Sequence, residues 1–397
     1  MFKNLNVYIV SVTFCMTMPG LAPTFSIYLG DYGVKFISIL LLFFGFKKIS
    51  KPFSYKFFTF IFSVLIVLFF YRFFHSTTAA EAQLSPFLST IWIVLLLLYI
   101  SDISHLVIFL KFLYLSCLIV LFSPGLNRIY DFSRLGYSVD RLENALVGIA
   151  SHYIEYASVA VISFYLSLFF LFITKKKIYK IFNLLVVITS VIAVITSGSR
   201  GAIISIILSL IFYIVLLVKN SSKKFNSKLG LFFCVMFLFL IFLLPWEKVF
   251  SAFLVMGSDQ DQSSLTRFAL FQFSLNNFLE NPIFGAGWDY TFLVKGKKSH
   301  SLIIQLLSEL GIVGLILEAL VYFMIFKMIK SFKYIKLNSL NQDIKFLLLS
   351  LFSIQSCFLF WCFFENLGFA FGTRFIYSNL ACLILSFSLI KFNKYYS

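Results

Sequence analysis

The sequence predicts an all-α, polytopic integral membrane protein of about twelve transmembrane helices, with a large extracytoplasmic loop that carries surface helices. Hydrophobic residues make up 60% of the 397 residues, charged residues only 12%, and the mean hydropathy is +0.96. A soluble domain of this length would need a more polar surface. The apolar runs are also long enough to cross a bilayer, which takes about 20 residues. Residues 1–397 are therefore predicted to form a single membrane domain.

The predicted spans follow one another with short connections in most places. The N-terminal apolar run is predicted to be a retained helix. A cleaved signal peptide is the alternative, but the run exceeds the usual length and Pro23 follows Ala22 where a small-residue cleavage site would be needed. In chain order the predicted spans are 6–28, 33–46, 56–74, 86–100, 104–123, 154–173, 181–197, 202–218, 229–246, 301–326, 346–364 and 373–391.

Lysine positions predict the orientation of these spans. With the N-terminus in the cytoplasm, 20 of the 33 basic residues fall in cytoplasmic segments, and all 20 are lysines. The short loops on the other side are nearly free of lysine, as the positive-inside rule requires. Both termini are therefore predicted to be cytoplasmic, and the two long loops, 124–153 and 247–300, periplasmic.

Arginine is distributed differently from lysine, because all seven arginines fall on the outer side of this topology. Topology needs positive charge inside and does not distinguish the two residues. The guanidinium group, however, binds phosphate or carboxylate through two parallel hydrogen bonds. An anionic ligand at the outer face would explain the segregation; ordinary ion pairs within the loops, where most acidic residues also lie, are the alternative. The arginines are Arg72, Arg128, Arg134, Arg141, Arg200, Arg267 and Arg374.

The loop 247–300 is the largest polar stretch of the chain. Apolar residues recur at helical spacing over 263–282, which predicts a helix on or near the membrane surface. This helix is predicted to stop at Asn281-Pro282 and to be followed by a flexible, glycine-containing turn over 284–288. The halves of the chain show no internal repeat, which disfavours transporters built from repeated halves.

The turn Ser197-Gly198-Ser199-Arg200-Gly201 joins two predicted spans and is the first candidate site. A helix start presents unpaired N–H groups and the positive end of the helix dipole, and so binds anions readily. Arg200 adds a guanidinium at the same point. The alternative is a plain helix-hairpin turn whose arginine extends to the membrane interface.

His300 opens the predicted span 301–326 and is the second candidate. Histidine is the usual general base near neutral pH. An interfacial histidine without catalytic role is the alternative. Glu309 is not expected to orient His300, because nine residues place it on the opposite face of the helix.

Other motifs do not predict a cofactor or metal. Asp259-x-Asp261 resembles the metal-binding pair of transferases that use nucleotide sugars, but those donors are cytosolic. Gly285-x-Gly287 lacks the strand and helix of a dinucleotide site. The remaining histidines lack metal-ligand spacing, and the cysteines lie in apolar runs without a C-x-x-C pair, so neither a zinc site nor a disulfide framework is expected. These residues are His75, His105 and His152, and Cys15, Cys117, Cys234, Cys357, Cys362 and Cys382.

Four segments in order resemble the O-antigen ligase/polymerase family of bacterial inner-membrane glycosyltransferases. The resemblance covers about 130–320, predicted here as the family-like core region. One residue departs from the family pattern: asparagine often follows the histidine, and here Ser301 stands there. The segments are the Arg134 loop, the turn Ser199-Arg200-Gly201-Ala202, the helix from Thr266-Arg267 to the turn ending at Gly287, and Ser299-His300-Ser301 leading into Glu309-Leu310-Gly311-Ile312-Val313-Gly314.

The resemblance implies transfer of a glycan from an undecaprenyl-diphosphate carrier to an acceptor hydroxyl at the periplasmic face, without metal, nucleotide or nucleic acid. Arg200 and Arg267 would hold the diphosphate and stabilise the charge that develops on it, with Arg134 as a further contact. His300 would deprotonate the acceptor hydroxyl. In-line attack would invert the anomeric carbon.

Three functions remain in competition. The first is a polymerase that extends O-antigen or capsular chains, with a chain-length regulator as a possible partner. The second is a ligase that transfers the chain to the lipid A core by the same chemistry. The Phe-rich, Arg-poor composition suits a variable polysaccharide locus and favours the polymerase.

The third function is a transporter or flippase of lipid-linked glycans. Such a protein should carry ionisable residues near mid-membrane, where Lys111 and Glu318 are the main candidates. The one-sided arginines favour an enzyme.

Overall fold

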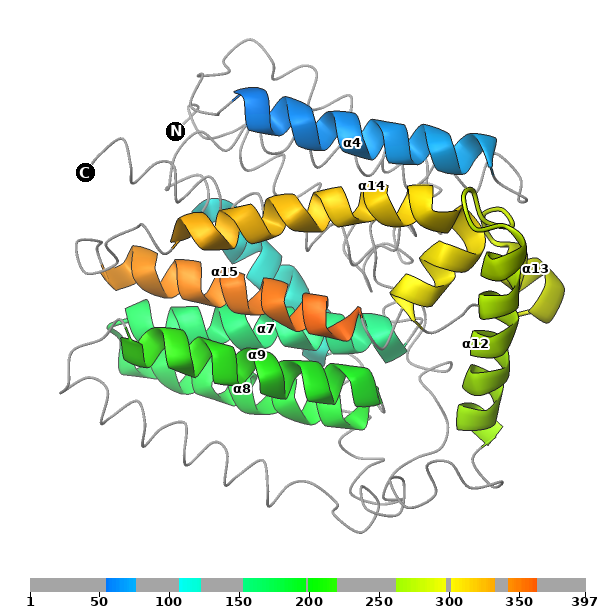
Figure 1. Cartoon of the computed structure of the whole chain (residues 1–397). Coiled ribbons are helices and arrows are strands. Elements are labelled where there is room, and N and C mark those ends of the chain that lie inside the picture. Colours follow the sequence, from blue (N-terminus) through cyan, green and yellow to red (C-terminus); the bar gives the residue numbers. More distant parts are fainter. Residues whose placement is uncertain are drawn as a thin grey trace, which may run out of the picture.

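The computed structural model of the chain describes residues 55–75, 107–122, 153–197, 199–219, 262–297, 301–332 and 342–362. Every regular element in these stretches is a helix (Figure 1). The labelled helices are α4 (Tyr55–Phe74), α7 (Tyr153–Ile173), α8 (Lys177–Thr196), α9 (Arg200–Lys219), α12 (Gln262–Glu280), α13 (Tyr290–Lys295), α14 (Leu302–Phe332) and α15 (Gln342–Trp361); a further apolar helix covers Val107–Phe122.

The predicted all-α class holds throughout the described residues. Among these, three helices are long and apolar enough to cross a membrane, namely α7, α8 and α14. Helices also occupy the predicted spans 56–74, 104–123, 202–218 and 346–364, and α12 occupies the predicted surface helix. The spans 6–28, 33–46, 86–100, 229–246 and 373–391 lie outside the described residues, as does nearly all of the loop 124–153. The total of twelve spans and their orientation therefore stay predictions.

Two helices extend beyond the predicted spans at ends rich in lysine. α8 begins at Lys177, where a span starting at 181 was predicted, and α14 continues to Phe332 beyond 326. Lysine is a good helix former although it is not apolar. Hydropathy therefore marks where a helix can be buried in lipid, and the helix itself continues past that limit.

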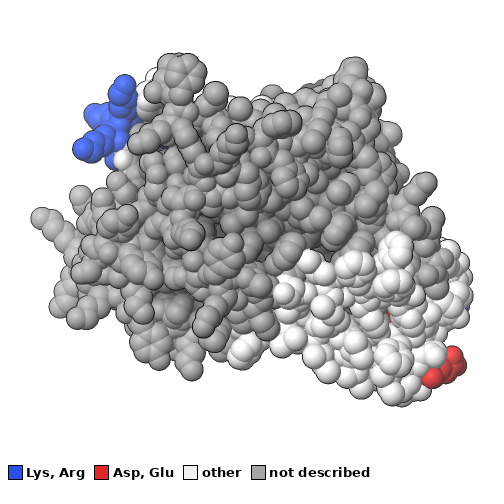
Figure 2. Space-filling view, turned by 90° about the horizontal axis from the view of Figure 1, so that it is seen from above, with Lys and Arg blue, Asp and Glu red and all other residues white. Residues whose placement is uncertain are grey.

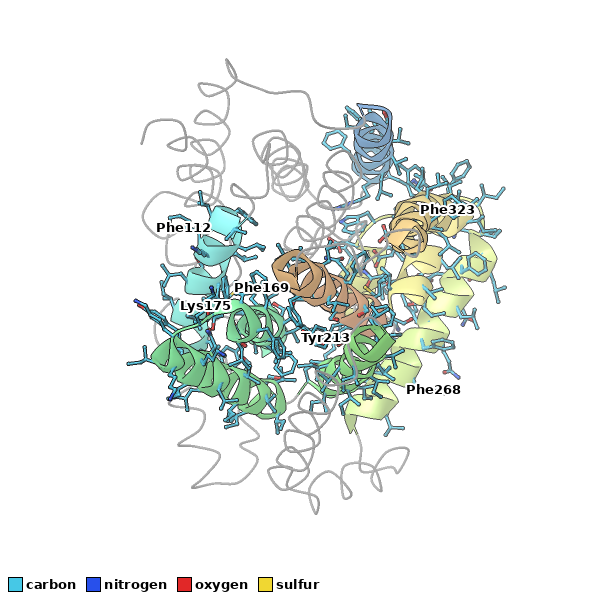
Figure 3. All side chains as sticks on the ribbon, turned by 90° about the vertical axis from the view of Figure 1, so that its left-hand side faces the viewer. Phe112, Phe169, Lys175, Tyr213, Phe268 and Phe323 are labelled. Carbon is cyan, nitrogen blue, oxygen red and sulfur yellow. The ribbon has the colours of Figure 1, made fainter. Side chains whose placement is uncertain are left out.

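α7 forms the centre of one group of helices. Every residue from Tyr156 to Phe170 is buried. α7 packs against α8, α9 and α15, and α15 also packs against α9. Figure 3 looks along these helices and shows Tyr213 of α9 in the space toward α15. The alanines and serines of α7 are small, so neighbouring backbones can approach it closely and cover it.

Hydrogen bonds and aromatic contacts join this first group. The Tyr165 hydroxyl bonds the Ser209 hydroxyl between α7 and α9. On the other side, Tyr114 donates to Asn183 Oδ1 at 2.8 Å and links the 107–122 helix to α8. The rings of Phe172 and Phe346 stack with centroids 4.8 Å apart between α7 and α15. Polar groups in the interior thus specify which helix faces meet.

A second group contains α4, α14, α12 and α13. α14 packs against both α4 and α12, and the short α13 contacts α12 and α14. α12 lies at one end of the bundle and runs nearly perpendicular to α4 and to the long part of α14 (Figure 1). Its outward residues include Leu265, Phe268 and Leu275, all exposed large hydrophobic side chains. A crosswise helix with such a face is the geometry expected for a helix at a membrane interface.

One face of the molecule carries a group of basic side chains away from an acidic one. Figure 2 shows Lys and Arg side chains gathered at one end of the face and an acidic side chain at the opposite end. Lys175, Lys176, Lys177 and Lys180 are all exposed where α7 ends and α8 begins. This basic connection lies at the opposite end of α8 from the Ser197–Arg200 turn.

The packing around α7 yields a first prediction. Ala160→Leu should lower the free energy of unfolding by about 1–3 kcal/mol, because the added carbons must displace neighbours in a fully buried interface. The thermal unfolding midpoint of the detergent-solubilised protein measures this. Ile207→Leu, at a side chain 40% exposed on α9, is the matched control and should leave the midpoint unchanged. An unchanged midpoint for Ala160→Leu would show that α7 is loosely packed.

Candidate functional site

The α8–α9 turn is a capped helix start. The Ser199 hydroxyl accepts a hydrogen bond from Ala202 N–H at 3.3 Å, as an N-cap residue does. Ile203 N–H then donates to the Ser199 carbonyl at 3.1 Å, the first bond of α9. Both Ser197 and Ser199 are buried. The Ser199 hydroxyl thus satisfies one of the N–H groups at the helix start that were predicted to bind an anion. Arg200 is the first residue of α9.

α12 holds Arg267 at the same end of the helices as this turn (Figure 1). Arg267 lies in the second turn of α12 and its side chain is exposed. The stripe of α12 that begins at Arg267 is buried further along the helix at Leu270, Ser274 and Asn277, and Asn277 Nδ2 donates to Ser308 Oγ at 3.4 Å. α12 is therefore anchored on α14 through this face, and Arg267 lies at the exposed N-terminal end of the same face.

α14 is broken at Gly311, which the sequence did not predict. Gly311 has φ 65° and ψ −163° within a run that is otherwise helical. A break leaves backbone groups without helical partners, and buried N–H and C=O groups must be satisfied. The segment after α12 satisfies them. Ile312 and Val313 N–H donate to the carbonyls of Pro282 and Ile283 at 3.0 and 3.2 Å.

The same segment returns hydrogen bonds to the other side of the break. Ala286 N–H donates to the Ser308 carbonyl at 2.8 Å, and Gly287 N–H to the Glu309 carbonyl at 3.0 Å. We call this four-bond exchange between residues 282–287 and 308–313 the backbone interlock. The prediction of a flexible turn over 284–288 was wrong, because these hydrogen bonds fix the turn against α14.

Two glycines make the interlock possible. A Cβ on Gly285 would lie 2.4 Å from the Glu309 carbonyl carbon, and one on Gly311 would lie 2.3 Å from the Ile283 carbonyl oxygen. Both residues also have positive φ, 76° and 65°. Glycine adopts this conformation without penalty and permits the close approach. Gly285 of the Gly285-x-Gly287 pattern thus has a packing role.

Glu309 supports the interlock from within. Its carboxylate is fully buried and accepts hydrogen bonds from Asp289 N–H at 3.0 Å and Gln305 Nε2 at 3.1 Å. Asp289 has φ 62°, an uncommon left-handed conformation for a residue other than glycine. The carboxylate therefore holds a strained turn in place just after the interlock.

α4 brings further functional candidates that sequence reasoning missed. The guanidinium carbon of Arg72 lies 3.7 Å from the centroid of the Trp288 ring, and both residues are buried. Tyr71 and His75 also reach the turn over 284–288. Arg72 had a usable signal, since an arginine at the end of an apolar helix is costly without a specific partner. The partner, however, is more than 200 residues away in the chain.

The structure places the helices of two predicted site residues at the same end of the bundle, and it does not describe the other predicted residues. Arg200 and Arg267 both belong to elements at the α12 end of the bundle (Figure 1). The side chain of Arg200 is outside the description, and so are Arg134 and His300 entirely. Ser301, the first described residue after the histidine, accepts a hydrogen bond from Gln305 N–H at 3.0 Å through its carbonyl and opens α14.

Comparison with known proteins bears directly on this end of the molecule. A family model described as O-antigen ligase matches residues 184–318. This part of the chain is similar to the O-antigen ligase family. The match, about a third of the chain, confirms the resemblance and contains α9, α12, the interlock and the first half of α14. The Arg134 loop and α4 lie outside it. A search of curated proteins found no match to the chain.

The match supports an enzyme of the O-antigen ligase/polymerase type in general. Members of this family are glycosyltransferase-like proteins of lipopolysaccharide biosynthesis in the bacterial inner membrane, and the apolar helices of the chain agree with that setting. The match is consistent with lipid-linked glycan and lipid A core as substrates in a broad sense. It does not distinguish extension of a chain from its ligation.

The interlock generates a second prediction. Gly285→Ala should destabilise the protein by more than about 3 kcal/mol, because the new methyl group overlaps the backbone of α14 at a positive φ. Gly296→Ala is the matched control: φ is +66° there, but nothing lies within 4 Å of the added Cβ, so the loss should be near 1 kcal/mol. Thermal unfolding of both variants separates overlap from conformational strain, and equal losses would contradict the interlock.

Proposed function

We propose that the protein is a polymerase that joins O-antigen or capsular repeat units at the periplasmic face of the inner membrane. The observation that supports a transferase of this type is the family match over 184–318, which contains three of the four resembling segments, with Arg200, Arg267 and His300 in order. The donor is a glycan on undecaprenyl diphosphate, and the acceptor is a hydroxyl of a second lipid-linked glycan. No metal, nucleotide or nucleic acid takes part. A chain-length regulator is a candidate partner.

The proposed reaction is a single displacement at the anomeric carbon. His300 accepts the proton of the acceptor hydroxyl as its oxygen attacks. The new glycosidic bond forms as the bond from the anomeric carbon to the diphosphate breaks, and undecaprenyl diphosphate leaves. Arg200 and Arg267 bind the diphosphate through their planar guanidinium groups and stabilise the charge that develops on it, with Arg134 as a further contact. In-line attack inverts the anomeric centre.

The placement of α12 supports a site at one end of the helices. Arg267 is exposed on a helix that runs across the bundle end where α9 begins (Figure 1). The lysine-rich α7–α8 connection is at the opposite end, which the positive-inside rule assigns to the cytoplasm. A diphosphate headgroup at a membrane interface would meet arginines in this position while its polyprenyl chain stays in lipid.

A ligase is the closest alternative function. It uses the same donor and the same chemistry but transfers the glycan to the lipid A core. The family description itself is that of a ligase, which is the observation in favour of this alternative. The choice of polymerase rests on composition: 55 phenylalanines and few arginines suit a gene from a variable polysaccharide locus.

A flippase of lipid-linked glycans is the alternative from another class. Such a protein should carry ionisable side chains along a path through the membrane. Glu318 is buried within α14, whereas Lys111 is exposed on the 107–122 helix, so these two do not share a common interior position. The family match also favours transfer over transport.

The experiment that tests the proposal is an assay in vitro with purified protein and one lipid-diphosphate-linked repeat unit, without added acceptor. A polymerase produces a ladder of increasing chain length on a gel. A product that appears only after lipid A core is supplied identifies the ligase. Absence of transfer in both formats, together with movement of the lipid-linked glycan across proteoliposomes, would replace the enzyme with the flippase.

His300→Ala should reduce turnover by about 10²- to 10⁴-fold, the usual contribution of a general base. Donor binding should be nearly unchanged, because the arginines bind the diphosphate. The ladder assay gives the rate, and binding of a labelled lipid diphosphate gives the affinity. Turnover within a few fold of the wild type would remove His300 from the mechanism.

Arg200→Lys should reduce turnover at least roughly tenfold although the charge is kept, because lysine cannot form two parallel hydrogen bonds to a phosphate. The same assay measures this. Lys175→Ala is the control, since Lys175 is an exposed residue of the opposite α7–α8 connection and should leave the rate unchanged. A rate for Arg200→Lys equal to that of the control would show that the guanidinium is not needed.

A further inference from the structure

The last turn of α4, taken here to include His75 just beyond its end, contacts the backbone interlock through three side chains. Tyr71, Arg72 and His75 all meet residues 284–288 or the break in α14. None of the three is in the segment that matches the family model. Any role they have must therefore be derived from their contacts.

Tyr71 touches both sides of the interlock with one atom. Its hydroxyl lies 3.0 Å from the Phe284 carbonyl oxygen and 2.9 Å from the Leu310 carbonyl oxygen. One hydroxyl hydrogen is shared between two acceptors that lie 26 residues apart in the chain. This position fixes the turn after α12 against the residue that precedes the helix break.

Arg72 and His75 hold the same turn one step further along the chain. The Arg72 guanidinium stacks on the Trp288 ring, where both groups are shielded from solvent and a cation–π contact is strong. His75 donates from Nε2 to the Gly285 carbonyl at 3.2 Å, and its own carbonyl accepts Trp288 N–H at 2.9 Å. The end of α4 therefore contacts the turn at Phe284, Gly285 and Trp288.

We propose that the last turn of α4 is a positioning element of the transferase site, which fixes α12 and its Arg267 relative to α14. This inference rests on the proposed function. α4 packs along α14 and also contacts the turn that follows α12. It therefore links α12 to α14 at the break in α14. The break in α14 does not by itself fix the angle between the two parts of the helix, and the contact with α4 helps to fix it. Reacting groups carried by separate helices need this support, because small misplacements lower rates strongly.

Tyr71→Phe is the decisive variant, because it removes one oxygen and keeps the ring. We expect kcat in the ladder assay to fall roughly tenfold or more, with donor KM changed much less, as for misaligned but intact binding groups. Tyr114→Phe is the matched control: it removes a buried tyrosine hydroxyl bonded to Asn183 Oδ1, remote from the interlock. It should leave both constants unchanged. Equal kcat values for the two variants would overturn the inference.

A distance measurement tests the same inference without relying on activity. Phe268 of α12 and Phe323 of α14 are each 60% exposed and both point outward in Figure 3, so each can be replaced by a spin-labelled, non-natural phenylalanine derivative with all cysteines kept. We expect one narrow distance distribution in the parent, a broader or displaced one with Tyr71→Phe, and the parent distribution with Tyr114→Phe. Unchanged distances with Tyr71→Phe would overturn the inference.

The two proposals fail separately in these experiments. A wild-type chain without transferase activity in either format would overturn the proposed function, whatever the distances show. Full transferase activity in Tyr71→Phe, at wild-type kcat, would overturn the positioning role and leave the function standing. Arg72→Met serves as a second variant and should act in the same direction; since it removes a buried charge, its fold is first checked by thermal unfolding.

Discussion

The exchange of backbone hydrogen bonds between residues 282–287 and 308–313 determines how the α12 end of the protein is built. It stabilises a break in α14 that would otherwise leave buried amide and carbonyl groups unsatisfied. The same four bonds set where α12 ends and how the chain enters α13. Because α12 lies across the end of the bundle, these hydrogen bonds hold a polar helix that carries Arg267 beside the apolar α14.

Two buried charged side chains beside the backbone interlock, Glu309 and Arg72, each have specific partners. Glu309 accepts hydrogen bonds from Asp289 N–H and Gln305, while Arg72 lies over Trp288. Replacing such groups one at a time leaves others without compensation, which makes them costly to lose even where they add little net stability. Specific alignment of helices is the better account of their presence.

The sequence predicted the described helices other than the short α13, because long apolar runs leave few alternatives to helix. It also identified α12 from helical spacing, and the family from four short motifs. The break at Gly311 could not be predicted, since glycine within an apolar helix is common and only the contact with Ile283 shows its need. Tyr71, Arg72 and His75 were missed for a related reason, because their partners are remote in the chain. The roles of Arg134, Arg200, Arg267 and His300 stay predictions.

The burial of α7 has a consequence for biogenesis. A helix covered along its length by α8, α9 and α15 has no face left for lipid, and it carries serines that hydrocarbon solvates poorly. Among the described helices that pack against α7, the last in the chain is α15, which is translated almost two hundred residues later. Between those moments α7 must share the translocon or a chaperone, or expose its serine-bearing side to the bilayer. Completion of this core is thus a late, post-insertion event, and the C-terminal portion of the chain governs it.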